Sequence, residues 1–387
     1  MYTAFSTVIS LVYYCGVLTV VRAAPAVDPR VLALPSSLNP YPAQPRITFR
    51  PDGTFKLTVF SDLHYGENAW DVWGPQQDVN SSKLMKRVLA DEKPDFVVLN
   101  GDLITGENTF KENSTVYIDE IVSNLNDAQI PFSSTYGNHD NNPNITHMAE
   151  FLREKLVSPH LSYTRILPSG GIYGPGNYWV PVYARASDFV PALILWAFDS
   201  RAGNTAGQNS TQVPDWVDDS VATWIENETK LMDSVWGPPG DQRAAVAFVH
   251  IPPFAIQQVW ENLNNTLNPG LDADSLGQGS TQATTKSSSQ GNDEPFWNSL
   301  NTNVKNLHAV ISGHDHGMEW CAREPTKNVI FCFDKHSGYG GYSSPGWDHG
   351  VRNILFTSPD PRDGPLSWIR LENGTTRAHV QLDDQYQ

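Results

Sequence analysis

Short apolar runs that end in polar residues recur along the chain. The clearest is Phe96-Val97-Val98-Leu99, which consists of β-preferring residues, follows Pro94 and precedes Gly101 and Asp102. An apolar run without alternation is typical of a strand that is buried on both faces of its sheet. We therefore predict strands wherever such runs occur. Further examples occupy residues 57–60, 192–197, 244–249 and 309–311, and a shorter one begins at Pro131-Phe132.

Segments with helical spacing separate these runs. In the first of them the apolar residues between 84 and 89 recur at helical intervals, Ser81 or Ser82 is the expected N-cap, and Pro94 ends the helix. Alternating strands and helices are the βαβ pattern of an α/β fold with a mainly parallel sheet. Strands between residues 351 and 382 would complete a second sheet. Further helices are predicted at about 115–128, 147–157, 215–236 and 296–306.

Potential metal ligands gather at the ends of the predicted strands. The carboxyl ends of strands form the usual ligand crevice of open α/β sheets, so side chains placed there are presented to a ligand. Carboxylate, amide and imidazole groups suit Mn, Fe, Zn or Mg-like ions, and the set is large enough for two ions. The candidate residues are Asp62, His64, Asp102, Asn138, His139, His250, His314 and His316.

The order of these motifs is specific. Asp-x-His at 62–64, Gly-Asp at 101–102, Gly-Asn-His-Asp at 137–140, a single His at 250 and Gly-His-x-His at 313–316 follow one another. This series resembles the calcineurin-like metallophosphoesterase superfamily over residues 57 to about 350. The stretch from Phe331 to Tyr342 resembles the branch related to purple acid phosphatases. The resemblance implies an α/β four-layer sandwich, in which two mixed β-sheets are flanked by helices.

The resemblance also assigns roles to the motif residues. Asp102 would bridge two metal ions, because each oxygen of a carboxylate can serve one cation. His139 would bind no metal, and would protonate the leaving alkoxide or stabilise the phosphoryl oxygens. Purple acid phosphatases carry an iron-binding Tyr in Gly-Asp-x-x-Tyr, but Thr105 stands at that position here. By the resemblance, Asp62, His64 and His316 hold one ion, and Asn138, His250 and His314 hold the other.

The implied activity is hydrolysis of phosphate esters by a metal-bound hydroxide, with two divalent or mixed-valence ions of Fe, Mn or Zn. The main expectation is a phosphomonoesterase that resembles acid phosphatases and acts on a small phosphate ester. One alternative is a phosphodiesterase of the same superfamily, and another is a secreted glycoprotein that keeps the fold without turnover. Every expected ligand is present, which favours an enzyme.

Composition narrows the range of partners. The chain has 387 residues, 40% of them hydrophobic and 11% aromatic, which is ample for a large core. Its net charge of −16 argues against binding to nucleic acid or to an anionic membrane. An acidic protein that acts on phosphate needs a local positive site, which two divalent ions would supply.

The N-terminal region has the features of a targeting segment. Residues 8–21 are almost entirely apolar, and small residues follow them. We interpret residues 1–23 as a cleavable signal peptide, with a transmembrane anchor as the alternative. Residues 24–46 are rich in Pro, which predicts an extended segment that leads into the domain. Residues 47–387 form the predicted catalytic domain. The expected location is outside the cell, free or associated with the cell wall.

Cysteine usage and glycosylation motifs agree with secretion. Cys15 would leave with the signal peptide, and Cys321 and Cys332 flank a turn-rich segment. We predict that these two form a disulfide across a hairpin, with two free core thiols as the alternative. Asn-x-Ser/Thr sequons are potential glycosylation sites. They occur at Asn80, Asn113, Asn144, Asn209, Asn227, Asn264 and Asn373.

Some other residues have weaker signals. Residues 262–294 are a low-complexity insertion that we expect to be disordered. His147 is expected at the surface, and Asp199 in a turn or behind a metal ligand. His336 is a candidate for the substrate pocket. Trp70 and Trp73 lie on a long loop that either packs onto the body or forms a pocket wall.

Overall fold

The computed structural model describes residues 38–277, 279–282 and 291–387. By their contacts these residues form one unit. The predicted signal peptide, Cys15 and the first part of the predicted lead-in lie outside the described residues. Among the described helices, none combines the length and the apolar character needed to cross a bilayer.

One sheet has six strands in the order β13-β12-β11-β2-β3-β4. Strands β2, β3 and β4 are parallel, so the residues that follow them, among them Asp62, Asp102 and Asn138, lie at the same edge of the sheet. Strand β11 pairs antiparallel with β2, and Arg352 lies opposite Val59. The region 351–382 therefore extends this sheet. The strands are β2 (Phe55–Phe60), β3 (Phe96–Asn100), β4 (Phe132–Thr135), β11 (Gly350–Phe356), β12 (Leu366–Leu371) and β13 (Thr376–Gln381).

The other sheet has seven strands in the order β1-β5-β6-β7-β8-β10-β9. Strands β6, β7 and β8 are parallel neighbours, whereas β5 and β9 run antiparallel to β6 and β10. The motif strands are thus divided between two mixed sheets. The strands are β1 (Ile47–Thr48), β5 (Tyr178–Tyr183), β6 (Leu193–Phe198), β7 (Ala244–Val249), β8 (Leu307–Ser312), β9 (Cys321–Glu324) and β10 (Val329–Phe333).

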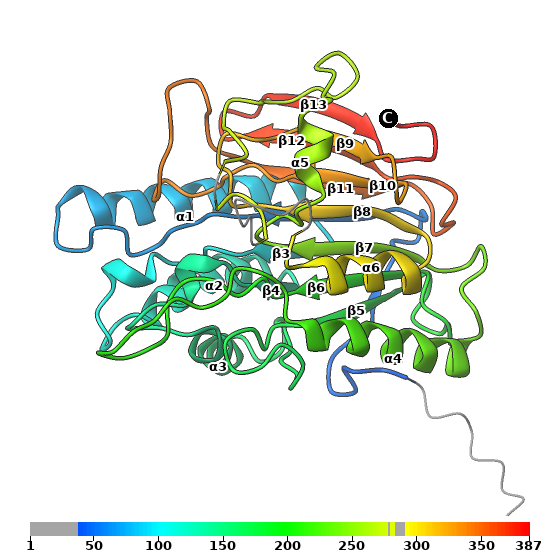
Figure 1. Ribbon diagram of the computed structural model, residues 1–387, viewed down its shortest axis with the longest axis horizontal. Helices are drawn as coiled ribbons and strands as arrows, with labels where there is room; N and C mark the ends of the chain where they lie inside the picture. The colour runs from blue at the N-terminus through cyan, green and yellow to red at the C-terminus, as the bar shows by residue number, and fades with distance from the viewer. Residues whose placement is uncertain (1–37, 278, 283–290) are drawn as a thin grey trace, which may run out of the picture. The chain divides into compact units, whose positions relative to one another are not determined.

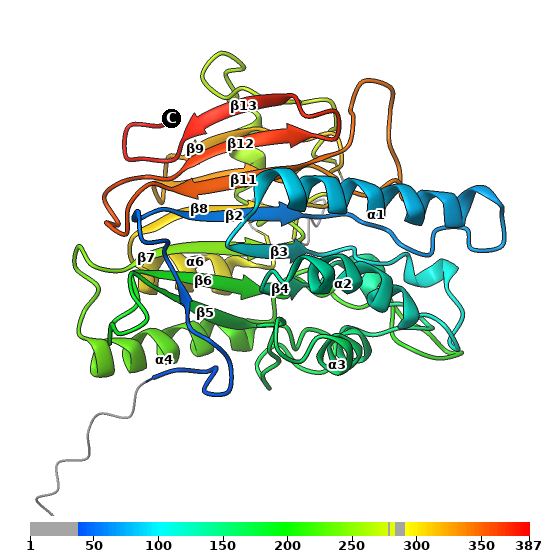
Figure 2. The same ribbon diagram turned by 180° about the vertical axis from the view of Figure 1, so that it is seen from behind.

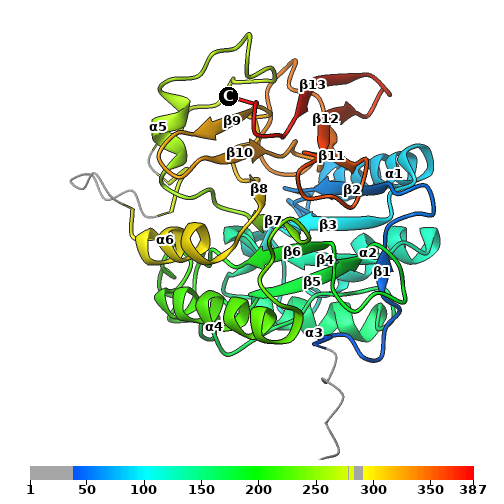
Figure 3. The same ribbon diagram turned by 90° about the vertical axis from the view of Figure 1, so that its right-hand side faces the viewer.

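The helices cover the outer faces of the two sheets. Strand β3 shows why: Phe96 and Val98 pack between the sheets, whereas Val97 and Leu99 pack against helices α1 and α2. Figures 1 and 2, seen from opposite sides, show α4, α5 and α6 in front of one sheet and α1, α2 and α3 in front of the other. Figure 3 shows the sheets between these helices. The predicted four-layer sandwich of two mixed sheets is confirmed.

Five of the described helices agree with the predicted segments except at their ends, and the short α5 (Ile256–Trp260) was not predicted. Helix α1 begins at Trp73, so the predicted N-cap at Ser81 or Ser82 is wrong. The two hydroxyls lie inside the helix, where Ser81 accepts a hydrogen bond from the backbone of Tyr339 and Ser82 pairs with the hydroxyl of Tyr65. The helices are α1 (Trp73–Glu92), α2 (Val116–Ala128), α3 (His147–Val157), α4 (Asp219–Trp236), α5 (Ile256–Trp260) and α6 (Glu294–Asn303), with 3₁₀ turns η1 (Gly106–Asn108) and η2 (Asn138–Asp140).

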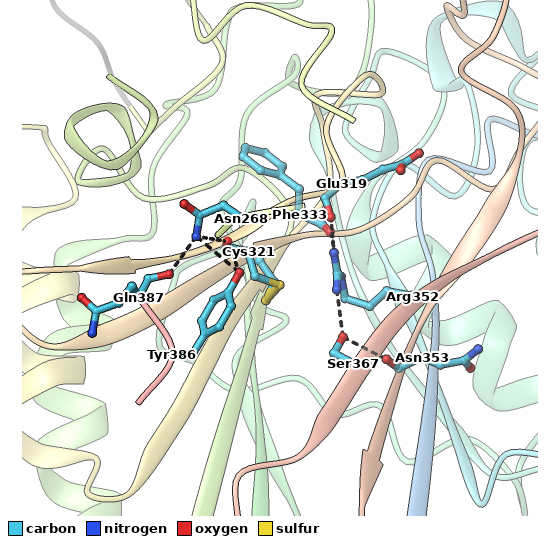
Figure 4. The surroundings of a disulfide bond; sticks show 10 residues. Asn268, Glu319, Cys321, Phe333, Arg352, Asn353, Ser367, Tyr386 and Gln387 are labelled. Carbon is cyan, nitrogen blue, oxygen red and sulfur yellow. Dashed lines mark hydrogen bonds between the residues drawn. A yellow bond between two sulfur atoms is a disulfide. The ribbon is translucent and has the colours of Figure 1, made fainter. Parts of the chain in front are cut away.

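The predicted disulfide is confirmed. Cys321 in β9 and Cys332 in β10 are directly paired across the hairpin and are joined by a disulfide. Figure 4 shows how other parts of the chain close around it. The hydroxyl of Tyr386 and the side-chain amide of Asn268 both donate to the carbonyl oxygen of Cys321, at 2.6 and 2.9 Å. The C-terminal segment and the described part of the low-complexity stretch are therefore anchored to this hairpin.

Candidate metal centre

Strands from both sheets bring the predicted ligands to one place. Strands β2, β3 and β4 come from one sheet, and β7 and β8 from the other. Side chains that follow these strands form groups whose ligand atoms lie within 4.8 Å of one another. Such groups could each hold a metal ion. They are Asp62 with His64 and His316, Asp102 with His250 and His314, and His64 with Asp102 and His139.

Asp102 lies between the two predicted ligand sets. Its Oδ2 is 3.0 Å from Nε2 of His250 and 3.8 Å from Nε2 of His64. Its Oδ1 accepts the backbone N–H of His139 at 2.8 Å. Oδ2 therefore faces a residue of each set and Oδ1 is fixed by the backbone, and the bridging role of Asp102 stays a prediction.

Some buried atoms of the site have no partner among the described residues. These atoms are Oδ1 of Asn138 and Nε2 of His64. Buried polar atoms are nearly always hydrogen-bonded in folded proteins, so such a group needs an explanation. An amide oxygen and an imidazole nitrogen left unpaired beside the carboxylates of Asp62 and Asp102 fit the ligand set of a metal centre.

The backbone is strained at the ends of the motif strands. Asp62, Asp102 and His314 have φ values of 49°, 48° and 78°, in the left-handed region that residues other than Gly rarely adopt. Strain of this kind costs about 1–3 kcal/mol per residue and collects at functional sites. Gly101 also has a positive φ, of 86°, and a Cβ there would in addition lie 2.5 Å from Nδ1 of His250.

Each candidate histidine ligand forms a hydrogen bond through one ring nitrogen to a residue outside the ligand set. Its other ring nitrogen then faces the metal centre. Such bonds fix the tautomer and the direction of a metal-binding imidazole. The engaged nitrogen is Nε2 in His314 and Nδ1 in the others. The partners are Thr105 Oγ1 for His64 (3.1 Å), Asn100 O for His250 (2.8 Å), Gly279 O for His314 (2.9 Å) and Tyr342 O for His316 (2.6 Å).

Thr105, which stands where the iron-binding Tyr would be, supports a ligand. Its hydroxyl donates to Oε2 of Glu67 at 2.6 Å, so it is free to accept a hydrogen bond from Nδ1 of His64. This arrangement leaves Nε2 of His64 for a metal. Glu67 gave no signal in the sequence, because its role depends on a contact between two loops.

Burial and mutual charge set the protonation of the centre. Burial lowers the pKa of His64 to about 3 and that of His314 to about 4, so both imidazoles are neutral, the form that binds metal. Burial opposes a charge on His250, but Asp102 raises its pKa to about 10. Burial disfavours the carboxylate of Asp62 also, yet His316 and His250 hold its pKa below the ordinary value. An ion that binds to His250 therefore displaces a proton.

His139 forms a pair with Glu107. Nδ1 of His139 lies 2.6 Å from Oε1 of Glu107, and Oε2 of Glu107 accepts a hydrogen bond from the side chain of Asn142 at 3.0 Å. The ring centroids of His139 and His64 are 4.8 Å apart. Since Glu107 occupies Nδ1, Nε2 of His139 remains available for a substrate. Sequence reasoning missed Glu107, because an acidic residue just after a Gly-Asp motif has no distinctive pattern.

Asp140 is turned away from the metal ligands. One of its oxygens accepts the backbone N–H groups of Leu103 and Ile104 at 2.9 and 3.1 Å, and the other accepts that of Gly137 at 2.8 Å. The carboxylate therefore ties the loop after Asp102 to the turn that carries Asn138 and His139.

The prediction that His147 lies at the surface is wrong. Its side chain is fully buried, with Nδ1 2.9 Å from Oδ2 of Asp199 and Nε2 3.0 Å from the carbonyl oxygen of Gly137. Its ring stacks on Tyr136 at 4.9 Å. The pair of His147 and Asp199 thus supports the turn just before Asn138. The buried face of α3 consists of polar residues, so the spacing of apolar residues in the sequence does not predict that His147 is buried.

Some aromatic candidates lie outside the substrate region. His336 is 1% exposed and stacks on His316, with centroids 5.2 Å apart, so it packs behind a ligand and does not line a pocket. Trp70 and Trp73 are 59% and 49% exposed, so they do not pack fully onto the body. Neither lines the cleft next to the metal ligands.

A cleft of about 350 Å³ opens beside the centre. Its polar lining contains two carboxylates, from Glu107 and Asp215, and the amides of Asn142 and Asn204. Asn138, His139 and His314 form its inner end, which connects it with the ligand groups. A substrate bound here would have its reacting group next to the centre.

Known proteins are similar to this chain over most of its length. "Probable inactive purple acid phosphatase 28" of Arabidopsis thaliana is 24% identical over 361 residues, which cover 88% of this chain and 83% of the relative. "Phosphatase DCR2" of Saccharomyces cerevisiae is 26% identical over 308 residues, which cover 74% of this chain and 48% of the relative.

Among solved structures, a dimetal phosphatase from Danio rerio shares the fold. It has a TM-score of 0.51 and 13% identity, and the match covers 86% of this chain and 100% of that one. The family model for calcineurin-like phosphoesterases matches residues 55–318, more than half of the chain. The chain therefore belongs to the calcineurin-like phosphoesterase family.

Proposed function

We propose that this chain is a secreted phosphoesterase with two metal ions, and that its main substrates are small phosphomonoesters. The observation that carries the proposal is the complete ligand set with the His139–Glu107 pair beside it. Two bound ions clamp the attacking and leaving oxygens of an in-line displacement and lower the pKa of bound water. Asp62, His64 and His316 would hold one ion, Asn138, His250 and His314 the other, and the carboxylate of Asp102 would be shared by both.

His139 is placed to act on the leaving group. Its backbone N–H is held by Asp102 and its Nδ1 by Glu107, so the ring has a defined position at the inner end of the cleft. Nε2 can then deliver a proton to the alkoxide that leaves the phosphorus. The same imidazole, when charged, would stabilise the phosphoryl oxygens. Burial opposes that charge, but Asp102 and Glu107 raise the pKa of His139 to about 9.

The electrostatics of the chain make it depend on metal. The net charge is −16, and the cleft itself contains Glu107 and Asp215. These groups repel a phosphate ester. Binding of the substrate therefore requires positive charge from the two ions, together with His139.

A second candidate function follows from the name of the Arabidopsis relative, which contains the word inactive. In this reading the chain is a glycoprotein that keeps the fold and the metal ligands but does not turn over a substrate. The retained ligands and the ordered His139–Glu107 pair favour the enzyme. The yeast relative is named a phosphatase, which also supports the proposal that this chain is an enzyme.

Secretion is supported by features outside the site. The Cys321–Cys332 disulfide suits an oxidising compartment. Each sequon Asn is exposed or half-buried, so none would have to leave the core to carry a glycan. These features agree with the predicted signal peptide.

Hydrolysis can be tested directly on the purified chain. Metal would be removed with a chelator and restored with Mn, Zn or Fe, and phosphate release would be measured on a panel of phosphomonoesters and phosphodiesters. The proposal expects release that requires metal and is fastest on monoesters. Faster turnover of diesters would support the diesterase alternative, and no release from any ester would support the non-catalytic one.

A further inference from the structure

Tyr342 makes three separate contacts with His316. Its carbonyl oxygen accepts the Nδ1–H of the imidazole at 2.6 Å, and its hydroxyl oxygen accepts the backbone N–H of His316 at 3.0 Å. The two rings are stacked, with centroids 4.1 Å apart and an interplanar angle of 13°. One residue therefore restrains both the backbone and the ring of this ligand candidate.

Asp274 holds the hydroxyl of Tyr342 in this position. The phenol donates to Oδ2 of Asp274 at 2.6 Å. The segment that carries Asp274 is itself anchored to the His316 loop, because the backbone N–H of Ala273 donates to the carbonyl oxygen of Gly317 at 3.0 Å. Asp274 belongs to the stretch that the sequence presented as a low-complexity insertion, but this part of it is packed against the site.

These contacts determine where the free nitrogen of His316 points. With Nδ1 engaged, Nε2 is the atom left for a metal, and it lies 3.5 Å from Oδ1 of Asp62. A bond from an outer group to a metal-binding imidazole sets its direction and raises its basicity, and loss of such a group costs about 10–100-fold in metal affinity or activity.

We propose that Asp274 and Tyr342 are a positioning pair, which fixes His316 for the metal ion that it shares with Asp62 and His64. This inference rests on the proposed metal centre, but it does not require that the chain turn over a substrate. Neither residue of the pair is assigned as a ligand or as a catalytic group. Tyr342 makes its shorter and more numerous contacts with His316, and its hydroxyl reaches the carbonyl oxygen of His314 only at 3.4 Å. The effect of the pair should therefore fall on the metal position of His316.

The test is a calorimetric titration of the metal-free chain with Mn²⁺ alone, for the wild type, Tyr342→Phe and Asp274→Asn. Tyr342→Phe removes the hydroxyl and with it the contacts to Asp274, to the backbone N–H of His316 and, at 3.4 Å, to the carbonyl oxygen of His314. It keeps the stacked ring and the carbonyl contact. We expect one ion to bind about tenfold more weakly, at the lower end of the usual cost, and the other to bind as in the wild type. Asp274→Asn should act in the same direction, and the double variant should be no weaker than Tyr342→Phe, because the two residues act as a unit.

Tyr339→Phe is the matched control. The hydroxyl of Tyr339 also donates to a carboxylate, that of Glu372, but Tyr339 stacks on His349 and not on His316. Both ions should bind to this variant as in the wild type. The Co²⁺-loaded protein offers a second signal, since its visible ligand-field spectrum should change in Tyr342→Phe and not in Tyr339→Phe.

Each outcome is decisive. Tyr342 is 48% exposed, so Tyr342→Phe should fold with an unchanged melting temperature. Wild-type affinity for both ions in Tyr342→Phe and Asp274→Asn would overturn the inference, as would equal weakening of both ions. A wild-type chain that binds no Mn²⁺ would overturn this inference together with the proposed function. A chain that binds two ions, shows the selective effect and hydrolyses no ester would overturn the proposed function alone.

Discussion

Removing the charge of Glu107 should slow hydrolysis only through His139. Glu107→Gln keeps an oxygen that can accept a hydrogen bond from Nδ1 of His139 but removes the carboxylate that lies 2.6 Å away. His139→Ala removes the imidazole itself. If Glu107 serves only to hold and charge this imidazole, its loss has no further effect once His139 is gone. The double variant should therefore be as slow as His139→Ala.

The expected sizes follow from exposure and chemistry. The side chains of His139 and Glu107 are 32% and 42% exposed, so solvent screens their interaction. Ion pairs of this kind contribute about 0.2–1 kcal/mol, and Glu107→Gln should cost at most about fivefold in kcat. His139→Ala should cost roughly 10²–10⁴-fold, the usual contribution of a general acid–base group.

The assay is kcat on an alkyl phosphate and on an activated aryl phosphate, with the metal content of every sample measured in parallel. The alkyl ester leaves as a basic alkoxide that needs a proton, so His139→Ala should lose more on it than on the aryl ester. Glu112→Gln, at an exposed position beyond η1, is the matched control and should keep wild-type rates.

Two results would refute the reasoning. If the losses of Glu107→Gln and His139→Ala multiply in the double variant, Glu107 acts independently of His139. If His139→Ala loses a metal ion, His139 is a ligand or holds one, as its place within 4.8 Å of His64 and Asp102 would also allow. Equal losses on both esters would point to electrostatic stabilisation of the phosphoryl group, not to proton donation.

Other features of the chain lead to further expectations. The protein loaded with iron should be colourless in the visible, because Thr105 replaces the iron-binding Tyr, and a tyrosinate-to-iron absorption band would contradict this. Replacing Cys321 and Cys332 by Ser should lower the free energy of unfolding by about 3 kcal/mol, since the bridge closes a loop with a sequence separation of 11; no change in denaturant unfolding would refute it. Burial opposes a charge on His147, but Asp199 raises its pKa above 6.5. Because the folded pKa is the higher one, the pair stabilises the fold fully below about pH 6.5 and loses this contribution as the pH rises through the raised pKa. The stability difference between the wild type and His147→Gln should therefore shrink toward alkaline pH, and a constant difference in urea unfolding would be evidence against it.

The strands were predictable because each is a run of apolar residues that can be recognised from the sequence of the segment itself. Phe96, Val97, Val98 and Leu99 are apolar without alternation, and the structure buries them alternately between the sheets and under the helices. Their division between two sheets was not predictable from such runs. It depends on pairings such as Arg352 with Val59, which no local pattern reveals.

The ligand candidates were predictable for a similar reason, since each follows a strand in a short motif with a characteristic order. The residues that orient them were not. Glu67, Asp274 and Tyr342 act through contacts between loops that are far apart in sequence. The pair of His147 and Asp199 is hidden because its residues are polar and yet fully buried. Burial of a polar group depends on its partner, which the sequence alone does not identify.

The central claim is that the residues around Asp102 bind two metal ions that this chain uses for hydrolysis. The most direct measurement is metal content by mass spectrometry together with phosphate release, on the same reconstituted samples of the wild type and Asp102→Asn. The account predicts two ions per chain and metal-dependent release for the wild type. For Asp102→Asn it predicts that at least one ion is loosened and that turnover is abolished, because the bridging oxygen loses its charge. Full metal content with undiminished turnover in the variant would contradict the account, as would a wild type that holds two ions and releases phosphate from no ester.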